Sequence, residues 1–411
     1  MRVQKTDVAV IGGGAAGLMT AGAAAARGLD VLLFEPNRCV GRKLGITGKG
    51  RCNVTNACPP GKVLENIPTN GSFLYSALSR FTPDDTMAFF ESLGVELKVE
   101  RGNRVFPCSD RAADIVNALR RYCADSGAAV VRERVVGIET DCARVRAVAT
   151  PSGRYECSSA VICTGGLSYP LTGSTGDGYK LAKACGHTVI PQRPSLVPLS
   201  AAQDFCAQMQ GLSLRNVSLT AFDSHGKKLF SDLGEMLFTH FGISGPLAIS
   251  ASAHMRDYEH ERYHVLIDLK PGLDEKKLDD RILRDFAKYS NREFANSLGE
   301  LLNRTMIPVV VRLSGIPGDE KVNSITRAQR RDLVRLIKNF RIDIAGPHSM
   351  DEAIITSGGI CVKEIDPKTM ESKLVHGLFF AGEVIDADAY TGGFNLQIAW
   401  STAQAAARSV R

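Results

Sequence analysis

Three glycines and one acid near the start of the chain have the spacing of a dinucleotide-binding site. Gly12, Gly14 and Gly17 fall in the run IGGGAAG, and Glu35 follows about 20 residues later. In such a turn, Gly12 permits the sharp bend, Gly14 lets the backbone approach a pyrophosphate, and Gly17 lets the next helix pack closely. The carboxylate of Glu35 can accept a hydrogen bond from a ribose hydroxyl. These residue types therefore predict that the chain binds a nucleotide cofactor.

The residues around the glycines predict the elements that hold them. Apolar residues at 8–11 and 31–34 predict two strands, and the Ala-rich segment between them predicts a helix that ends near Arg27. The first N–H groups and the dipole of that helix would hold the phosphate charge. An ordinary strand–helix unit with a Gly-rich turn is the alternative, but strand, glycines, helix and acid together favour the cofactor site. Because Gly and Ala dominate the uncharged segment Val8–Ala26, we expect no signal peptide and no membrane span.

Composition places the chain among ordinary globular proteins. It has 411 residues, of which 44% are hydrophobic and 23% charged, and this length favours two or three domains. The net charge of +6 suits an enzyme of anionic cofactors without requiring nucleic acid. The 11 cysteines show no CxxC pair and no metal-ligand spacing. We therefore expect reduced thiols, a cytoplasmic location and no metal site.

A glycine-rich basic loop follows Glu35. Its four cations would lie near the phosphate end of the cofactor, and they are Arg42, Lys43, Lys49 and Arg51. The glycines between them allow the backbone to lie against a flat ligand, whereas a solvated basic loop is the alternative. Cys52 and Cys58 lie in the same loop. A redox thiol beside a flavin is conceivable there, but buried inert cysteines are favoured.

Two further strand ends and one helix start point to the same edge of a sheet. The apolar run Ala160–Cys163 leads into Thr164 and Gly165, and the run Leu378–Ala381 leads into Gly382 and Glu383. Open α/β sheets bind ligands at the carboxyl ends of their strands. The last helix would begin near Gly393, where its N–H groups can face an anion. Since both ends of the chain then complete one domain, the middle is predicted to be an insertion.

The boundaries of that insertion follow from composition. A proline-rich stretch after residue 190 marks its start, so we predict a discontinuous domain of residues 1–190 and 346–411 around an insertion of residues 191–345. Alternating residues predict strands at Leu212–Phe222 and Val265–Leu269, and helical spacing predicts a helical part at about 273–306. The segment Arg327–Arg341 predicts an amphipathic helix with a basic face, for which a solvated surface is favoured over a phosphate or nucleic-acid role.

Five motifs together resemble the YhiN/BaiN-like family of NAD(P)/FAD-dependent oxidoreductases, the HI0933-like flavoproteins. The motifs are GRKLGITGKGRCNVTN, RGNRVFP, TGGLSYPLTGSTGDGY, FTHFGISGP and AGEVIDADAYTGGFNLQIAW, and they span essentially the whole chain. The resemblance implies an α/β fold with a Rossmann-like FAD-binding domain of the two-dinucleotide-binding type. It also implies an inserted β-barrel-like domain with a helical subdomain, and FAD in the first site.

The resemblance also extends the set of cofactor-binding residues. It implies that Val136 lies near the adenine and that Glu383, Asn395 and Leu396 lie near the flavin. Together with the residues indicated above, the predicted FAD-binding set is Gly12, Gly14, Ala15, Ala16, Gly17, Glu35, Arg42, Lys43, Asn53, Val136, Thr164, Gly165, Gly382, Glu383, Gly393, Asn395 and Leu396.

The resemblance further implies reduction of an activated C=C bond in a hydrophobic ring substrate such as a 3-oxo bile-acid or steroid-like enone. A hydride from N5 of reduced FAD would reach the β-carbon, and a proton would reach the α-carbon. Tyr390, His240 and Tyr169 are the candidate proton or hydrogen-bond donors, although packing tyrosines and a structural histidine are the commoner roles.

The electron donor and the direction of the reaction stay open in the sequence. The chain has no second strand–GxGxxG–helix pattern, so NAD(P)H would visit the flavin transiently or another reductant would be used. An oxidase of amines or aminoketones that passes electrons to oxygen is one alternative, and an RNA-directed or non-catalytic flavoprotein is another. We expect a small hydrophobic substrate and no dedicated nucleic-acid site, and the oligomeric state is left undetermined.

Overall fold

The computed structural model describes residues 2–349 and 353–411, and the contacts within the chain divide it into two units. The first unit comprises Met1–Ser195 and Ala353–Arg411, and the second comprises Leu196–Glu352. Each unit has its own hydrophobic core: Trp400 and Phe34 are buried in the first, and Phe340 and Ile337 in the second. Among the described residues, no helix is both long and apolar enough to cross a membrane.

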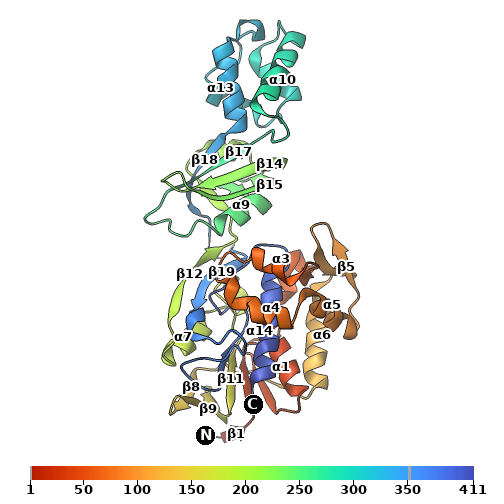
Figure 1. The fold of residues 1–411 in the computed structure, drawn as a ribbon, viewed down its shortest axis with the longest axis vertical. Helices are drawn as coiled ribbons and strands as arrows, with labels where there is room; N and C mark the ends of the chain where they lie inside the picture. Colours follow the sequence, from red (N-terminus) through yellow and green to blue (C-terminus); the bar gives the residue numbers. More distant parts are fainter. Residues whose placement is uncertain (1, 350–352) are drawn as a thin grey trace. The chain divides into compact units, whose positions relative to one another are not determined.

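A five-stranded parallel sheet is the centre of the first unit (Figure 1). Its strand order is β20 (Leu378–Phe380), β11 (Ser159–Ile162), β2 (Val8–Ile11), β3 (Val31–Phe34) and β7 (Ala129–Val131). Every residue of β2 is buried, which explains its uninterrupted apolar run. Because β20 from the end of the chain pairs with β11 beside β2, the two ends of the sequence build one sheet.

Helices cover this sheet and smaller sheets flank it. Helix α1 (Ala15–Ala25) contacts both α14 (Phe394–Ser409) and α6 (Ala112–Asp125). The other helices of the unit are α2 (Arg42–Ile46), α3 (Pro60–Glu65), α4 (Tyr75–Arg80), α5 (Pro83–Ser92) and α7 (Asp177–Ala184), with short 3-10 turns η1 (Thr47–Gly50), η2 (Gly71–Leu74), η3 (Pro170–Thr172) and η6 (Val362–Glu364). The flanking strands are β1 (Arg2–Lys5), β10 (Gly153–Glu156), β9 (Arg144–Ala149) and β8 (Gly137–Asp141) in one sheet, and β4 (Thr55–Asn56), β6 (Arg104–Pro107) and β5 (Leu97–Glu100) in another.

The chain leaves and re-enters the first unit on two paired strands. Strand β12 (Val189–Ser195) leads out, β19 (Ile355–Ile360) leads back, and the two are antiparallel. The carboxylate of Asp388, which is buried, accepts hydrogen bonds from Ser195 Oγ at 2.9 Å and from Ser357 Oγ at 3.0 Å. Asp388 therefore ties the two crossing strands to the loop before α14.

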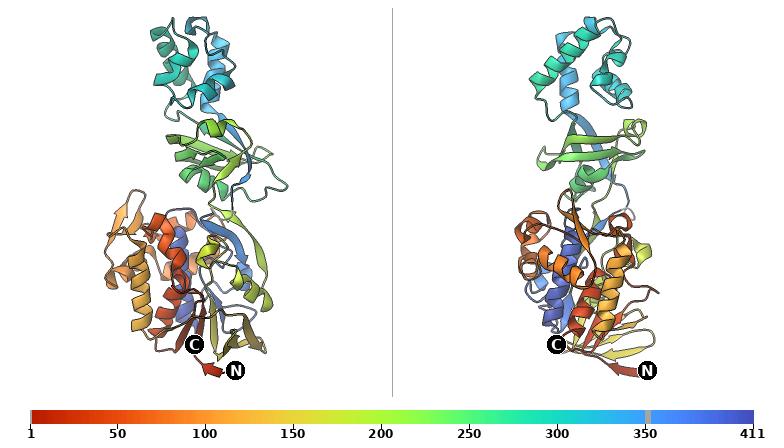
Figure 2. Two further views of the ribbon diagram at one scale, coloured as in Figure 1. Left: turned by 180° about the vertical axis from the view of Figure 1, so that it is seen from behind. Right: turned by 90° about the vertical axis from the view of Figure 1, so that its right-hand side faces the viewer.

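The second unit contains a closed six-stranded barrel (Figure 2). Its strands are β13 (Leu199–Ala201), β16 (Gly242–Ser244), β15 (Lys228–Phe238), β14 (Ser213–Phe222), β17 (Tyr263–Asp268) and β18 (Phe340–Pro347). Strand β17 alternates between buried and half-buried side chains, as expected for a strand with one face in a barrel interior. The short helix α8 (Phe205–Gln208) and helix α9 (Gly245–Ser252) accompany the barrel.

Helices fill the connection between β17 and β18. They are α10 (Glu275–Lys288), α11 (Phe294–Ser297), η4 (Leu298–Glu300), α12 (Ile307–Ser314), η5 (Val322–Ser324) and α13 (Arg327–Lys338). Helices α12 and α13 lie beyond residue 306 in this connection, and Pro308 in the first turn of α12 is compatible with a helix start. The α/β class, the Rossmann-like domain and the barrel with helices are confirmed.

Candidate functional site

The three fingerprint glycines have three different surroundings. Gly12 has φ +104°, and a Cβ there would lie 2.7 Å from the carbonyl oxygen of Cys163 on the neighbouring strand. A Cβ on Gly17 would overlap the carbonyl oxygen of Gly12, so glycine is required for the contact between α1 and β2. A Cβ on Gly14 would meet nothing within 4 Å. Gly12 and Gly17 therefore close the turn, whereas Gly14 leaves open space at the N-terminus of α1.

Glu35 is held in place by main-chain donors beside this turn. Its Oε2 accepts a hydrogen bond from the Gly13 N–H at 2.9 Å, and its Oε1 accepts from the Asn37 N–H at 2.8 Å and from Asn37 Nδ2 at 2.7 Å. Arg42 in turn donates to Asn37 Oδ1 at 2.8 Å. Each carboxylate oxygen has two lone pairs, so a ribose hydroxyl still has an acceptor here. Asn37 was not predicted to hold Glu35, because this contact depends on the turn after β3 and no residue pattern in the sequence indicates it.

An ion pair joins helix α2, which forms within the segment that the sequence predicts to be a basic loop, to the end of β20. Lys43 Nζ lies 2.6 Å from Glu383 Oε2, and the side chains are only 21% and 16% exposed. Lys43 also donates to Ser168 Oγ at 2.6 Å, and Ser168 Oγ donates to Glu383 Oε1 at 3.1 Å. The same Oε1 accepts from the Thr356 N–H at 2.9 Å. Two predicted residues, Lys43 and Glu383, thus form one polar cluster with two residues that sequence reasoning missed.

The third element of that cluster is the loop after β11. Thr356 Oγ1 accepts hydrogen bonds from the Leu167 N–H at 2.7 Å and from the Ser168 N–H at 3.1 Å. Gly166 is required at this point, because a Cβ would collide with Thr356 Oγ1. The only sequence signal for the contact is the glycine itself, within the motif TGGLSYP.

Four buried side-chain oxygens in the first unit lack a hydrogen-bond partner among the described residues, and one of them is Glu133 Oε2. The other three are Asn53 Oδ1, Thr164 Oγ1 and the hydroxyl oxygen of Tyr179. Asn53 and Thr164 belong to the predicted cofactor set, whereas Tyr179, which is 5% exposed, does not. Burial, together with the charges of Glu383 and Asp386, raises the pKa of Tyr179, so its hydroxyl stays protonated. A buried polar group without a partner is costly, so these atoms fit a site completed by a bound polar ligand.

The strand end at Gly382 lies against the start of α1. Gly382 has φ +80°, and a Cβ there would lie 2.8 Å from the Cβ of Ala16. Its N–H donates to Thr402 Oγ1 at 3.0 Å. The structure therefore brings together predicted residues from opposite ends of the chain.

The loop before α14 is closed by one side chain. Asn395 Oδ1 accepts from the Ala389 N–H at 2.8 Å, and its Nδ2 donates to the Ala389 carbonyl at 2.7 Å and to the Tyr390 carbonyl at 3.3 Å. Gly393 precedes α14 with φ +98°, and a Cβ there would collide with the backbone of Thr55. These contacts fix the backbone on which Tyr390 lies.

The three candidate proton donors fall in different places. Tyr169 is half-buried, has φ +55°, and its ring centroid lies 5.9 Å from Lys43 Nζ. Tyr390 is half-buried and its N–H donates to the Asn66 carbonyl at 3.0 Å. His240 is exposed in the second unit, where its ring packs edge-on to Phe241 with centroids 5.0 Å apart. The contact between its ring and Lys43 thus joins Tyr169 to the Lys43–Glu383 cluster.

The remaining residues of the predicted FAD-binding set range from exposed positions to positions packed against the core of the first unit. Val136 is 58% exposed, and its N–H donates to the Ala149 carbonyl at 2.8 Å. Leu396 and Ala15 are half-buried against the core of the first unit. Gly165 has φ +73° and a Cβ there would lie 3.6 Å from Ser174 Oγ.

Cys52 and Cys58 are free thiols, and neither is exposed. Burial raises the pKa of Cys52 to about 12 and also raises that of Cys58. Since the thiolate is the reactive form, both surroundings disfavour redox chemistry at neutral pH. The described residues contain no group of three side chains that could hold a metal ion.

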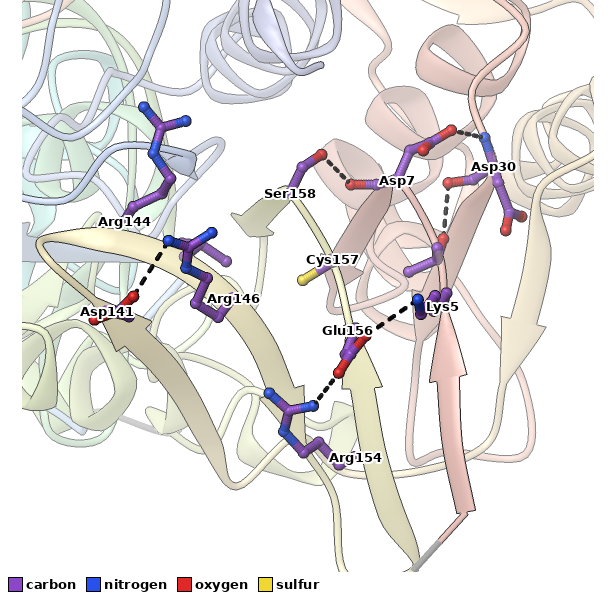
Figure 3. Close-up of a pocket in the computed structure, with 12 residues that line it drawn as sticks. Lys5, Asp7, Asp30, Asp141, Arg144, Arg146, Arg154, Glu156, Cys157 and Ser158 are labelled. Carbon is purple, nitrogen blue, oxygen red and sulfur yellow. Dashed lines mark hydrogen bonds and ion pairs between the residues drawn. The ribbon is translucent and has the colours of Figure 1, made fainter.

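A groove of about 770 Å³ lies at the opposite edge of the sheet (Figure 3). It includes Asp7, Asp30 and Ser158, which precede β2, β3 and β11, so it faces the amino ends of these strands. The cations and carboxylates that line it are largely paired with one another, as in Arg154–Glu156 at 2.7 Å and Arg146–Asp141 at 3.2 Å. None of the predicted site residues lines this groove, and it is separate from the candidate cofactor site.

The glycine turn, the acid after β3 and the parallel sheet with its ligand edge define a dinucleotide-binding domain of the Rossmann type. Residues 6–409 match the family model described as HI0933-like protein Rossmann domain, and the chain belongs to this family. The resemblance drawn from the five motifs is thereby confirmed.

Two relatives match along nearly their whole length. The ribosomal RNA dihydrouridine synthase of Haemophilus influenzae is 34% identical over 99% of this chain and 99% of its own. The 3-dehydro-bile acid delta(4,6)-reductase of Clostridium scindens is 30% identical over 98% of each chain. Among solved structures, 3-ketosteroid delta1-dehydrogenase from Sterolibacterium denitrificans has a TM-score of 0.51 and 11% identity over 99% of each chain, a likeness in fold alone.

Proposed function

We propose that this protein is an FAD-dependent reductase of a C=C bond conjugated to a carbonyl group. The observation that carries the proposal is full-length similarity to two relatives whose names describe related chemistry. Formation of dihydrouridine saturates the uracil C5=C6 bond, which is conjugated to the C4 carbonyl. Reduction at the 4 and 6 positions of a 3-oxo bile acid saturates bonds conjugated to the 3-oxo group. One active site that delivers a hydride to a β-carbon would serve both substrates.

The buried polar atoms and the open space above Gly14 fit FAD. We assign the pyrophosphate to Gly12, Gly14, Ala15, Ala16 and Gly17 at the start of α1, and the ribose to Glu35. Asn53 Oδ1 and Thr164 Oγ1 would gain the hydrogen-bond partners that they lack. When bound, FAD supplies the acceptor and donor of the hydride. The Lys43–Glu383 cluster and the loop closed by Asn395 would hold the protein groups at the flavin end.

For the substrate we favour a uracil in ribosomal RNA. The RNA-modifying relative is the more similar of the two, at 34% identity against 30%. Ribosomal RNA is a cytoplasmic substrate, in keeping with the predicted location. The second candidate is a small hydrophobic ring with a 3-oxo enone, which the bile-acid reductase supports over an equal share of the chain.

The reaction needs a proton for the α-carbon as well as a hydride for the β-carbon. We assign the proton to the hydroxyl of Tyr169, which would be replenished from solvent. Its support is the contact of its ring with Lys43, whose ion pair with Glu383 fixes the cation beside it. Tyr390 is the alternative, because Asn395 holds its carbonyl in place. His240, exposed on the second unit, is the third candidate.

We propose NAD(P)H as the electron donor. Because the sequence holds no second dinucleotide fingerprint, the nicotinamide would bind near the flavin only transiently. One NAD(P)H would supply the two electrons that saturate one C=C bond. An oxidase would instead deliver the electrons of its substrate to oxygen and release peroxide.

The test mixes the FAD-loaded protein with NADH or NADPH without oxygen and then adds one acceptor. The acceptors are an unmodified ribosomal RNA transcript, free uridine and a 3-oxo-Δ4 steroid. We expect the nicotinamide to bleach the flavin absorbance and the RNA to restore it, with a mass gain of two hydrogens on one uridine. Restoration of the flavin absorbance by the steroid alone would favour the second candidate substrate. Release of peroxide with an amine under air would favour the oxidase over the proposed reductase.

A further inference from the structure

Helix α13 carries cations where a helix disfavours them. Five of its 12 residues are Arg or Lys, only Asp332 is acidic, and its first turn contains no acid. The N-terminal end of a helix has a partial positive charge, so Arg327, Arg330 and Arg331 add to the potential there. Helix α10 shows the conventional order, with Asp274 as N-cap, Glu275 in the first turn and Lys288 in the last. The difference concentrates positive charge at one end of α13.

Two of the five cations of α13 are used within the fold. Arg330 Nε lies 2.6 Å from Asp279 Oδ1 of α10. Lys338 Nζ lies 2.6 Å from Asp268 Oδ2 and donates to the Leu273 carbonyl at 2.6 Å. These two side chains therefore attach the helix to its neighbours.

The other three arginines share an exposed face. Arg327, Arg331 and Arg335 are spaced by four residues, which places them above one another on one side of the helix. Arg327 and Arg331 form no ion pair with any residue that the structure describes. Arg335 contacts Asp332 at 3.3 Å, with both side chains 63% exposed, an arrangement of little strength in water.

The orientation of this face is fixed by packing. Leu333, Val334 and Ile337 are buried in the core of the second unit, and the Leu269 N–H donates to the Ile337 carbonyl at 3.0 Å. A capping box of Thr326 and Gln329 closes the helix start, with Thr326 N–H donating to Gln329 Oε1 at 2.8 Å. The three arginines are therefore carried on a rigid support, which lowers the entropy lost when they bind.

We propose that Arg327, Arg331 and Arg335 form a phosphate-binding surface, the α13 surface, that docks the backbone of the RNA substrate. The inference rests on the proposed function, in which the reduced uracil is part of ribosomal RNA. Guanidinium groups suit this partner because their planar fork can bond two oxygens of one phosphate. Contacts of this kind carry affinity and position the RNA without reading its sequence. The surface accordingly distinguishes RNA from a free nucleoside, which has no backbone to dock.

The experiment compares two triple variants of the FAD-loaded full-length protein. One is Arg327→Ala, Arg331→Ala and Arg335→Ala. The control removes three exposed arginines of the first unit that form no ion pair with described residues, as Arg120→Ala, Arg132→Ala and Arg144→Ala. Binding of a ribosomal RNA transcript is measured by fluorescence anisotropy over a range of salt concentrations. Both variants must keep the flavin absorbance and the melting temperature of the wild type; if the α13 triple does not, Arg327→Ala and Arg331→Ala are measured singly.

We expect the α13 variant to bind the transcript about 10-fold or more weakly, with the slope of log K against log salt reduced by roughly 2, the value for three lost phosphate contacts. The control should retain affinity and slope. Equal losses in both variants, unchanged binding by the α13 variant, or no binding by the wild type would each overturn the α13 surface. If binding depends on α13 but no dihydrouridine forms, the proposed reaction fails and the surface stands. If both variants reduce RNA uridine with the same KM, the surface fails and the reaction stands.

Discussion

Lys43 and Glu383 are 340 residues apart in the sequence and form an ion pair with 2.6 Å between Nζ and Oε2. The pair connects helix α2 to the strand end at β20, and Ser168 from a third segment bonds to both partners. The ion pair therefore links the two sequence segments that build the first unit, and we call it the joint of this unit.

Removal of one partner of this joint should destabilise the protein. In Lys43→Met the carboxylate of Glu383 loses its cation while still largely buried, which we expect to cost roughly 2 kcal/mol of unfolding free energy. Urea denaturation of the FAD-free protein measures it. The exposed pair Lys62–Glu65, at 2.7 Å, provides the control, and Lys62→Met should leave the urea midpoint unchanged. An unchanged midpoint in Lys43→Met would show that the pair contributes nothing to the joint.

Alanine at two fingerprint glycines should separate folding from cofactor binding. Gly17→Ala places a Cβ on the Gly12 carbonyl oxygen and should destabilise the FAD-free protein by about 3 kcal/mol. Gly14→Ala meets only open space, so the FAD-free protein should keep its stability while FAD binds about 10-fold more weakly. Thermal unfolding and FAD titration give the two quantities. Normal FAD affinity in a folded Gly14→Ala protein would contradict the assignment of the pyrophosphate to this position.

Thr164→Val tests whether the unpartnered hydroxyl belongs to the cofactor site. Because Thr164 Oγ1 is buried without a partner, its replacement by a methyl group should leave the FAD-free protein as stable as before or stabilise it by about 1 kcal/mol. FAD affinity should nevertheless decrease. Thr86 is the matched control, since its single hydroxyl proton has two acceptors within reach, the Thr82 carbonyl at 3.1 Å and Gln397 Oε1 at 2.9 Å, and Thr86→Val should destabilise the fold. Unaltered FAD affinity in Thr164→Val would argue against the assignment.

His187 should make stability fall in mild acid. Burial lowers the pKa of His187 below its ordinary value, although Glu364 at 3.2 Å opposes the shift. The unfolded chain then binds a proton more readily than the folded chain, so the contribution is intact above about pH 6.5 and decreases below it. Urea midpoints at several pH values between 5 and 7.5 should fall less steeply for His187→Gln than for the wild type. Replacement of the exposed His225 provides the control, and parallel profiles for all three proteins would exclude His187 as the source.

The sequence predicted the fold more completely than it predicted the residues of the candidate site. The fingerprint glycines, the strand ends and the terminal helix predicted the α/β class, because each is a local pattern. Ser168 and Thr356 escaped prediction because their contacts join segments 188 residues apart, which only the folded sheet brings together. Tyr179 escaped because nothing in its neighbourhood of the sequence distinguishes a hydroxyl without a partner from an ordinary packed tyrosine.

The division of the first unit between the two ends of the chain has a consequence for synthesis on the ribosome. The second unit is one continuous segment, whereas the first lacks β20 and α14 until residues 378–409 emerge. Domains fold as units, with earlier segments first, so we expect the barrel and its helices to become protease-resistant in nascent chains that are still missing the C-terminus. Limited proteolysis of stalled nascent chains would test this order. The nucleotide fingerprint, although translated before the second unit, would then mature after it.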